Sequence, residues 1–133
     1  MPPDARSREV AAEWMRRARS NLVRAKQPKP EEAFWEDFCF DAQQAAEKAV
    51  KAILVFHGVD FPRTHRISEL LALLNQAGHV IPASLWEADR LSDYAIVTRY
   101  PGSRYPVDQP EHGQAVELSE QVLRWAERML HTR

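Results

Sequence analysis

Apolar side chains recur along most of this chain at steps of three and four residues, which is the spacing of one face of an α-helix. The clearest run covers about residues 31–57 and keeps this step at Phe34, Phe38, Ala42, Ala45, Ala49, Ala52 and Phe56. Gly58 then supplies a suitable C-cap. The small residues at its centre let another helix approach closely, so we predict a helix in the middle of a bundle. Glu47, Lys48 and Lys51 are expected to face solvent or a subunit partner.

The same periodicity predicts four further helices. They cover about residues 7–26, 66–77, 82–99 and 111–131. No segment of useful length alternates apolar and polar residues as a half-buried strand does. We therefore predict an all-α fold, an up-and-down bundle of four long helices plus one short helix. Residues 1–133 form one domain, with its core over about 7–131.

Composition narrows the class of protein. The chain has 133 residues, 44% hydrophobic and 28% charged, with a net charge of -1, which argues against a surface that coats DNA. Cys39 is the only cysteine, so no intrachain disulfide and no cysteine-cluster metal site can form. The N-terminus lacks the apolar core of a signal peptide, and no run is long enough to span a membrane. We expect a cytoplasmic protein with no membrane contact.

Several residues that could bind a ligand lie in the segment that follows the fourth predicted helix. Pro101, Gly102 and Pro106 force a loop there. It carries two guanidinium groups and two phenol rings, from Arg99, Tyr100, Arg104 and Tyr105. Arginine suits phosphate and tyrosine offers a ring face to a base, so one hypothesis is a nucleotide or RNA contact. In the alternative, Arg99 pairs with a carboxylate and the tyrosines pack over the end of the bundle.

A second candidate segment precedes the third predicted helix. Arg63, His65 and Arg66 lie beside a helix N-terminus, where an anion can bind. The alternative makes Thr64 a helix cap and His65 a hydrogen-bonded linker residue. No histidine pair has helical metal-ligand spacing and no glycine loop suits a phosphate, so we expect no metal and no cofactor.

Three stretches together resemble the HEPN family (higher eukaryotes and prokaryotes nucleotide-binding). They are residues 38–52, Arg63-Thr64-His65 and residues 94–101, and the resemblance runs from about Trp14 to Trp125. It implies a helical bundle that forms a homodimer. It also implies a partner, a minimal nucleotidyltransferase encoded alongside, often as a toxin–antitoxin pair. Many members are metal-independent ribonucleases with an Arg followed, after four to six residues, by a His.

This chain departs from that ribonuclease motif. No histidine follows Arg99 at the expected distance, and seven residues separate Arg104 from His112. Arginine stays protonated and cannot replace histidine as a base. The leading hypothesis is thus a dimeric, non-catalytic module that binds nucleotide, RNA or a partner. The alternatives are a ribonuclease toxin that uses Arg99 or Arg104 with His112, and a purely structural oligomerisation domain.

Overall fold

The fold is all-α, as predicted. The computed structural model describes residues 3–96 and 106–131, and these contain helices but no strand. In chain order the helices are α1 (Ala5–Ala25), α2 (Trp35–Phe56), α3 (Ile67–Gln76), the 3₁₀-helix η1 (Ala83–Leu91), α4 (Ser92–Ile96) and α5 (Gln109–Leu130).

Local capping explains where several of these helices begin and end. Asp4 accepts a hydrogen bond from the Ser7 N–H (2.7 Å) at the start of α1, and Asp108 accepts one from the Glu111 N–H (2.9 Å) at the start of α5. Gly58 adopts a φ of 70° after α2, a left-handed conformation that favours glycine. Gly58 therefore ends α2 as predicted, although the C-cap residue itself is His57, directly before it.

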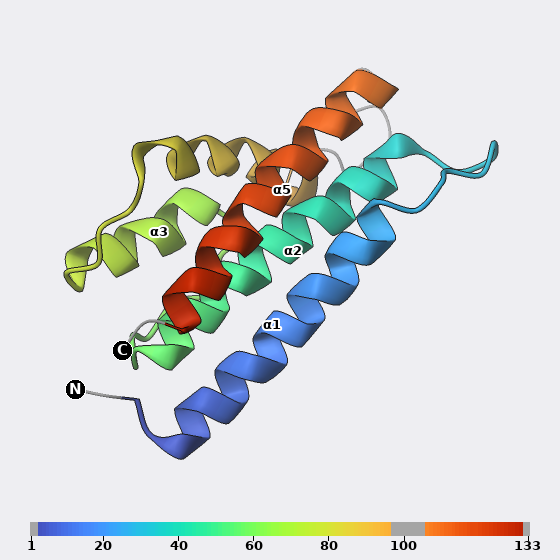
Figure 1. Cartoon of the computed structure of the whole chain (residues 1–133). Coiled ribbons are helices and arrows are strands. Elements are labelled where there is room, and N and C mark those ends of the chain that lie inside the picture. The colour runs from blue at the N-terminus through green and yellow to red at the C-terminus, as the bar shows by residue number, and fades with distance from the viewer. Residues whose placement is uncertain (1–2, 97–105, 132–133) are drawn as a thin grey trace.

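The three long helices α1, α2 and α5 lie side by side (Figure 1). Ion pairs join Arg19 to Glu127 and Lys26 to Glu120. A step of seven residues toward the C-terminus along α1 therefore matches a step of seven residues toward the N-terminus along α5. These two helices are thus antiparallel. In contrast, α2 and α5 run parallel. The Ser119 hydroxyl donates to the Ala42 carbonyl (2.8 Å), and the ring of His112 packs on Trp35. Both contacts join residues that are equally far apart in the sequence, so the two helices advance in the same direction.

The fourth predicted helix differs from expectation. The sequence predicted one long α-helix over residues 82–99, whereas η1 is a 3₁₀-helix that runs into the single turn of α4, and residues 97–99 lie outside the described part. Asp89 accepts hydrogen bonds from the N–H of Ser68 (2.8 Å) and the hydroxyl of Ser92 (3.1 Å). Such side chains compete with the regular backbone ladder, which accounts for the irregular helix.

The core forms around α2, which confirms its predicted central place. Its alanines have no exposed surface: Ala42, Ala45, Ala46, Ala49 and Ala52. The expectation that Glu47 and Lys51 face solvent is wrong, because Glu47 is 3% exposed and the Lys51 side chain 13%. Polar partners from the chain itself cover them, as described below.

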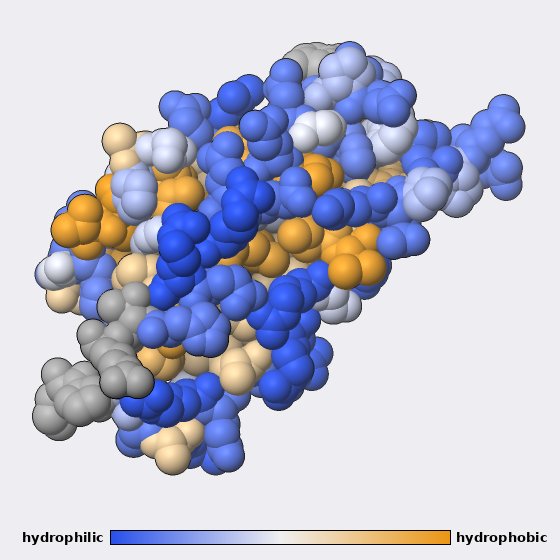
Figure 2. Space-filling model, in the orientation of Figure 1, coloured by the Kyte–Doolittle hydropathy of each residue, from blue (hydrophilic) through white to orange (hydrophobic). Residues whose placement is uncertain are grey.

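The outer surface is mostly polar but not completely so. Figure 2 shows hydrophilic residues over most of one face, with hydrophobic residues visible in the seam between α1 and α5 and beside α3. Within the described residues, the large hydrophobic side chains that are exposed are Val23, Phe34, Val80 and Ile96. Trp125 is buried, while the other three tryptophans pack half-buried against the core.

Candidate functional site

The predicted loop residues Arg99, Tyr100, Arg104 and Tyr105 lie outside the described residues, but the helices on both sides of them are in place. The Tyr94 hydroxyl donates to Glu111 Oε2 at 2.5 Å and so ties α4 to α5. Burial, followed by the bond to Glu111, raises the pKa of Tyr94 far above its ordinary value, so the phenol keeps its proton and donates.

A cleft of about 450 Å³ lies around this bond. Its polar lining consists of Arg90, Asp93, Tyr94, Asp108, Glu111 and Gln114. Among these described residues, three carboxylates face one guanidinium. The cleft therefore offers acceptors for hydroxyl or amino groups, whereas a phosphate would need cations from elsewhere.

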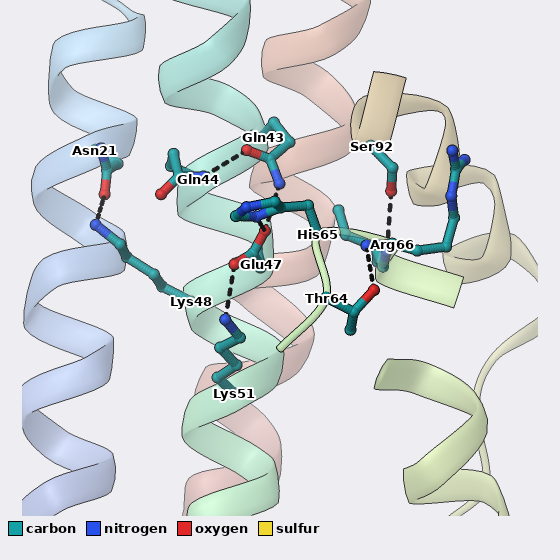
Figure 3. A network of polar contacts seen from close by, with 11 residues as sticks. Asn21, Gln43, Gln44, Glu47, Lys48, Lys51, Thr64, His65, Arg66 and Ser92 are labelled. Carbon is teal, nitrogen blue, oxygen red and sulfur yellow. Dashed lines mark hydrogen bonds and ion pairs between the residues drawn. The ribbon is translucent and has the colours of Figure 1, made fainter. Parts of the chain in front are cut away.

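The second predicted segment meets α2 at a buried carboxylate, Glu47 (Figure 3). Gln43 Nε2 donates to Oε1 at 2.6 Å, Lys51 Nζ to Oε2 at 2.8 Å, and His65 Nδ1 lies 3.0 Å from Oε1. Burial raises the pKa of Glu47, but hydrogen bonds from Lys51 and His65 outweigh it and leave the pKa below its ordinary value. The carboxylate is thus ionised and accepts from all three groups.

This arrangement fixes the tautomer of His65. Because an ionised Glu47 can only accept, Nδ1 of His65 carries the proton, and Nε2 is the remaining acceptor of the neutral ring. The side chain of His65 is 54% exposed, and Arg63 is also exposed in the same linker. His65 is therefore a hydrogen-bonded linker residue, as one of the two interpretations predicted, and still reaches solvent.

The N-terminus of α3 already holds an anion from the chain itself. The N–H groups of Ile67 and Ser68 donate to Ser92 Oγ (2.9 Å) and to Asp89 Oδ1 (2.8 Å). Arg66 Nη1 lies 3.3 Å from Asp89. Burial raises the pKa of Asp89, but these bonds lower it further than burial raises it. Asp89 therefore takes the place at this helix end where the sequence suggested an external anion.

The alternative that made Thr64 a helix cap is wrong, because the Thr64 hydroxyl accepts the N–H of Arg66 at 3.0 Å, two residues along the linker, and not an N–H of α3. The N-cap residue of α3 itself is Arg66.

His112 is held at the junction of α1 and α5. Its Nε2 lies 2.7 Å from the carbonyl oxygen of Ala25, and its ring centroid lies 4.6 Å from that of Trp35. A carbonyl only accepts, so Nε2 carries a proton and cannot itself act as a base. The ring of His112 thus binds a carbonyl at the C-terminal end of α1.

Sequence reasoning missed several polar groups that the fold buries. Asn21 Nδ2 donates to Asp41 Oδ1 at 3.0 Å, while Lys48 Nζ donates to Asn21 Oδ1 at 2.8 Å. Arg24 lies 3.6 Å from Asp41. These contacts join α1 to α2. The signal in the sequence that could have predicted them is a polar residue at a position where the helical pattern expects contact between helices.

Among the described residues, no group of three or more histidine, cysteine or acidic side chains has a geometry suited to a metal ion. Within the same part of the chain, no helix combines the length and apolar character that crossing a membrane requires.

Comparison with known proteins settles the family. Residues 11–129 match the family model described as HEPN domain. The chain belongs to the HEPN family. The resemblance inferred over residues 14–125 is thus confirmed, and the protein is a HEPN domain, a helical module of the nucleotide-binding and ribonuclease type.

Two solved structures share this HEPN fold. TT1696 from Thermus thermophilus is 33% identical, with a TM-score of 0.77 over 90% of this chain and 97% of that one. ST0689, described as an archaeal HEPN homologue, is 28% identical, with a TM-score of 0.73 over the same shares. Among curated proteins, no relative matches the sequence.

Proposed function

We propose that this HEPN domain binds the phosphate groups of a nucleotide or RNA without cleaving them, as a homodimer that acts with a minimal nucleotidyltransferase. The observation that carries the non-catalytic part is the position of His112. Its Nε2 is bound to the Ala25 carbonyl, and in sequence it lies too far from Arg104 for the ribonuclease spacing of the family.

Binding is proposed for the segment between α4 and α5. Arg99 and Arg104 supply the cations that phosphate needs, and Tyr100 and Tyr105 supply rings for a base. The bond between Tyr94 and Glu111 supports this assignment, because it brings the two ends of the segment together. The acidic cleft beside that bond offers acceptors for ribose hydroxyls.

The partner is proposed from the family resemblance, in which a nucleotidyltransferase and a HEPN domain form a toxin–antitoxin-type pair. A homodimer is proposed because exposed apolar side chains such as Phe34, 68% exposed, and Val80, 85% exposed, remain on the single chain.

Calorimetric titration with ATP and with a short RNA tests the binding. We expect the variant Arg99→Ala/Arg104→Ala to bind at least about tenfold more weakly, which corresponds to about 1.4 kcal/mol. The control Arg6→Ala/Arg124→Ala removes the same charge at exposed positions of α1 and α5 and should bind as the wild type does. No heat from the wild type with either ligand at millimolar concentration would overturn the proposal.

Incubation of RNA with the protein in EDTA separates this function from the ribonuclease alternative. The proposal expects intact RNA. Cleavage that disappears in Arg104→Ala and in His112→Asn would replace binding by catalysis. Binding of the nucleotidyltransferase that survives in the Arg99→Ala/Arg104→Ala variant, with no nucleotide bound by either protein, would instead leave a structural interaction domain.

A further inference from the structure

An exposed phenylalanine lies in an acidic segment just before α2. Phe34 is the N-cap residue of that helix, and 68% of its surface is exposed. Two carboxylates precede it and two follow it within three residues, from Glu31, Glu32, Glu36 and Asp37. Among the residues that the structure describes, none of the four forms an ion pair. The segment therefore presents an apolar ring surrounded by negative charge.

The lysines of the same loop do not neutralise this charge. Lys29 Nζ donates to the backbone carbonyls of Pro30 (3.1 Å) and Ala33 (2.9 Å), and Lys26 pairs with Glu120 on α5. Both ammonium groups are thus held by other acceptors. A partner that supplies cations to the acidic segment would meet carboxylates that are still accessible.

A hollow of opposite charge lies between α5 and the start of η1. Its volume is about 290 Å³, and its walls carry the guanidinium groups of Arg124 and Arg128 and the amide of Gln121. Its floor is made by the edges of Leu85 and Trp125, each 4% exposed. No carboxylate is found among the described residues that line it. The hollow therefore combines an apolar floor with a positive rim.

The carboxylates around the hollow do not cancel its charge. Glu120 and Glu127, on the same half of α5, pair with cations of α1. Glu87 and Glu117 are exposed and lie outside the lining. Arg124 itself forms no ion pair with any described residue. Its guanidinium is thus available to a carboxylate from outside the chain.

The acidic segment and the hollow belong to opposite ends of the molecule. Figure 1 shows the loop between α1 and α2 at one end, whereas the connection from α3 to η1 lies at the other. Val80, in that connection and 85% exposed, adds apolar surface two residues before Pro82 of the hollow. A single chain therefore leaves both surfaces open. Two copies placed antiparallel bring each acidic segment to the hollow of the other copy, and the contact forms twice.

We propose that Phe34 of one copy enters the hollow of a second copy, with Glu31 against Arg124, and that a two-fold axis repeats this contact. The ring covers the apolar floor, and the ion pairs at the rim fix its position. The inference rests on the proposed homodimer and states which surfaces form it. The second copy is the occupant because this chain itself carries the acidic, aromatic segment that the hollow fits.

Sedimentation equilibrium of the full chain tests the charge pairing. We expect Arg124→Glu and Glu31→Lys each to weaken the homodimer about a hundredfold, since each reverses a charge at both contacts and costs about tenfold at each. The matched control Arg6→Glu reverses an exposed charge on α1 and should dimerise as the wild type does.

A mixture of the two variants gives the decisive measurement. In a dimer of one Arg124→Glu copy and one Glu31→Lys copy, one contact is the native pair and the other is the same pair with its charges exchanged. An equimolar mixture should therefore recover a dimer of nearly wild-type affinity, although each variant alone is monomeric at the same concentration. A mixture that stays monomeric would overturn the pairing of Glu31 with Arg124.

The role of the ring is tested separately from charge. Phe34→Ser should weaken the homodimer at least about tenfold, because the floor of the hollow loses its cover. The control Val23→Ser removes another exposed apolar side chain, 58% exposed on α1, and should leave the dimer unchanged. Equal affinities for Phe34→Ser and Val23→Ser would contradict the insertion of the ring.

The outcomes separate this inference from the proposed function. Wild-type dimerisation in both Arg124→Glu and Phe34→Ser would overturn this contact and leave the homodimer in place. A wild type that stays monomeric at millimolar concentration would overturn both, and assemblies larger than a dimer would contradict the two-fold axis. ATP titration of Arg124→Glu should match the wild type, because the hollow is distant in sequence from the segment between α4 and α5. A failure of nucleotide binding is thus recorded independently of this contact.

Discussion

Nδ1 of His65 lies 3.0 Å from Oε1 of Glu47, a contact that joins the linker after α2 to the middle of that helix. Glu47 is buried and His65 is half-exposed at its side chain, so the bond reaches from the core to the surface. Lys51 and Gln43 donate to the same carboxylate, so Glu47 holds these two side chains in place on one side of α2. Removal of the charge of Glu47 is therefore expected to lower the free energy of unfolding.

Glu47→Gln should destabilise the fold by about 1–3 kcal/mol, because it keeps the side-chain shape but leaves Lys51 without its anion. Urea unfolding followed by circular dichroism measures the change. The control Glu32→Gln removes an exposed carboxylate from the loop before α2 and should stay within about 0.5 kcal/mol of the wild type. Equal midpoints for the two variants would show that the buried charge contributes nothing.

Tyr94 and Glu111 should be energetically coupled, since the hydroxyl of Tyr94 donates to Oε2 of Glu111. A double-mutant cycle with Tyr94→Phe and Glu111→Gln should give a coupling of about 0.5–3 kcal/mol in the free energy of unfolding. Purely additive effects would mean that the bond does not hold α4 to α5. ATP titration of Tyr94→Phe then reports whether this bond also supports binding.

The alanines of α2 are expected to reject larger residues. Ala46 has no exposed surface in the core, so Ala46→Leu should cost about 1–3 kcal/mol through overpacking. Ala12→Leu makes the same change at an exposed position of α1 and should be close to neutral. Thermal unfolding of both variants distinguishes them, and a neutral Ala46→Leu would contradict close packing of α2.

The regular helices could be predicted from sequence because their periodicity is strong. The predicted range 66–77 differs from α3 (Ile67–Gln76) by one residue at each end, and Gly58 ends α2 as expected. These features depend on short-range chemistry, namely amphipathic spacing and the left-handed conformation that glycine tolerates.

The polar interior could not be predicted in the same way. From its sequence context Glu47 is expected at the surface, because its partner at residue 65 lies 18 positions away along the chain. Asp89 likewise takes its role only when the start of α3 packs against η1. Such contacts are tertiary, and a helical pattern on one segment carries no information about the partner on another.

Acid should weaken the fold through His57, whose ring centroid lies 4.1 Å from that of His79. The Nε2 atom of His57 is buried and has no hydrogen-bond partner among the described residues. Burial lowers the pKa of His57 below its usual 6.5, and the nearby His79 lowers it further. The unfolded chain therefore binds a proton at a pH where the folded chain does not, and stability falls as the pH drops below about 6.5.

Urea midpoints at pH 7.5 and pH 5.5 measure this loss, which His57→Gln should reduce. Glu47 and Asp89 have lowered pKa values and lose their contribution only below their ordinary values of 4.5 and 3.8, so they do not act in this window. The control His131→Gln, at the exposed end of α5, should keep the wild-type dependence. If His57→Gln and the wild type lose equal stability between these two pH values, the imidazole of His57 is not the group that titrates.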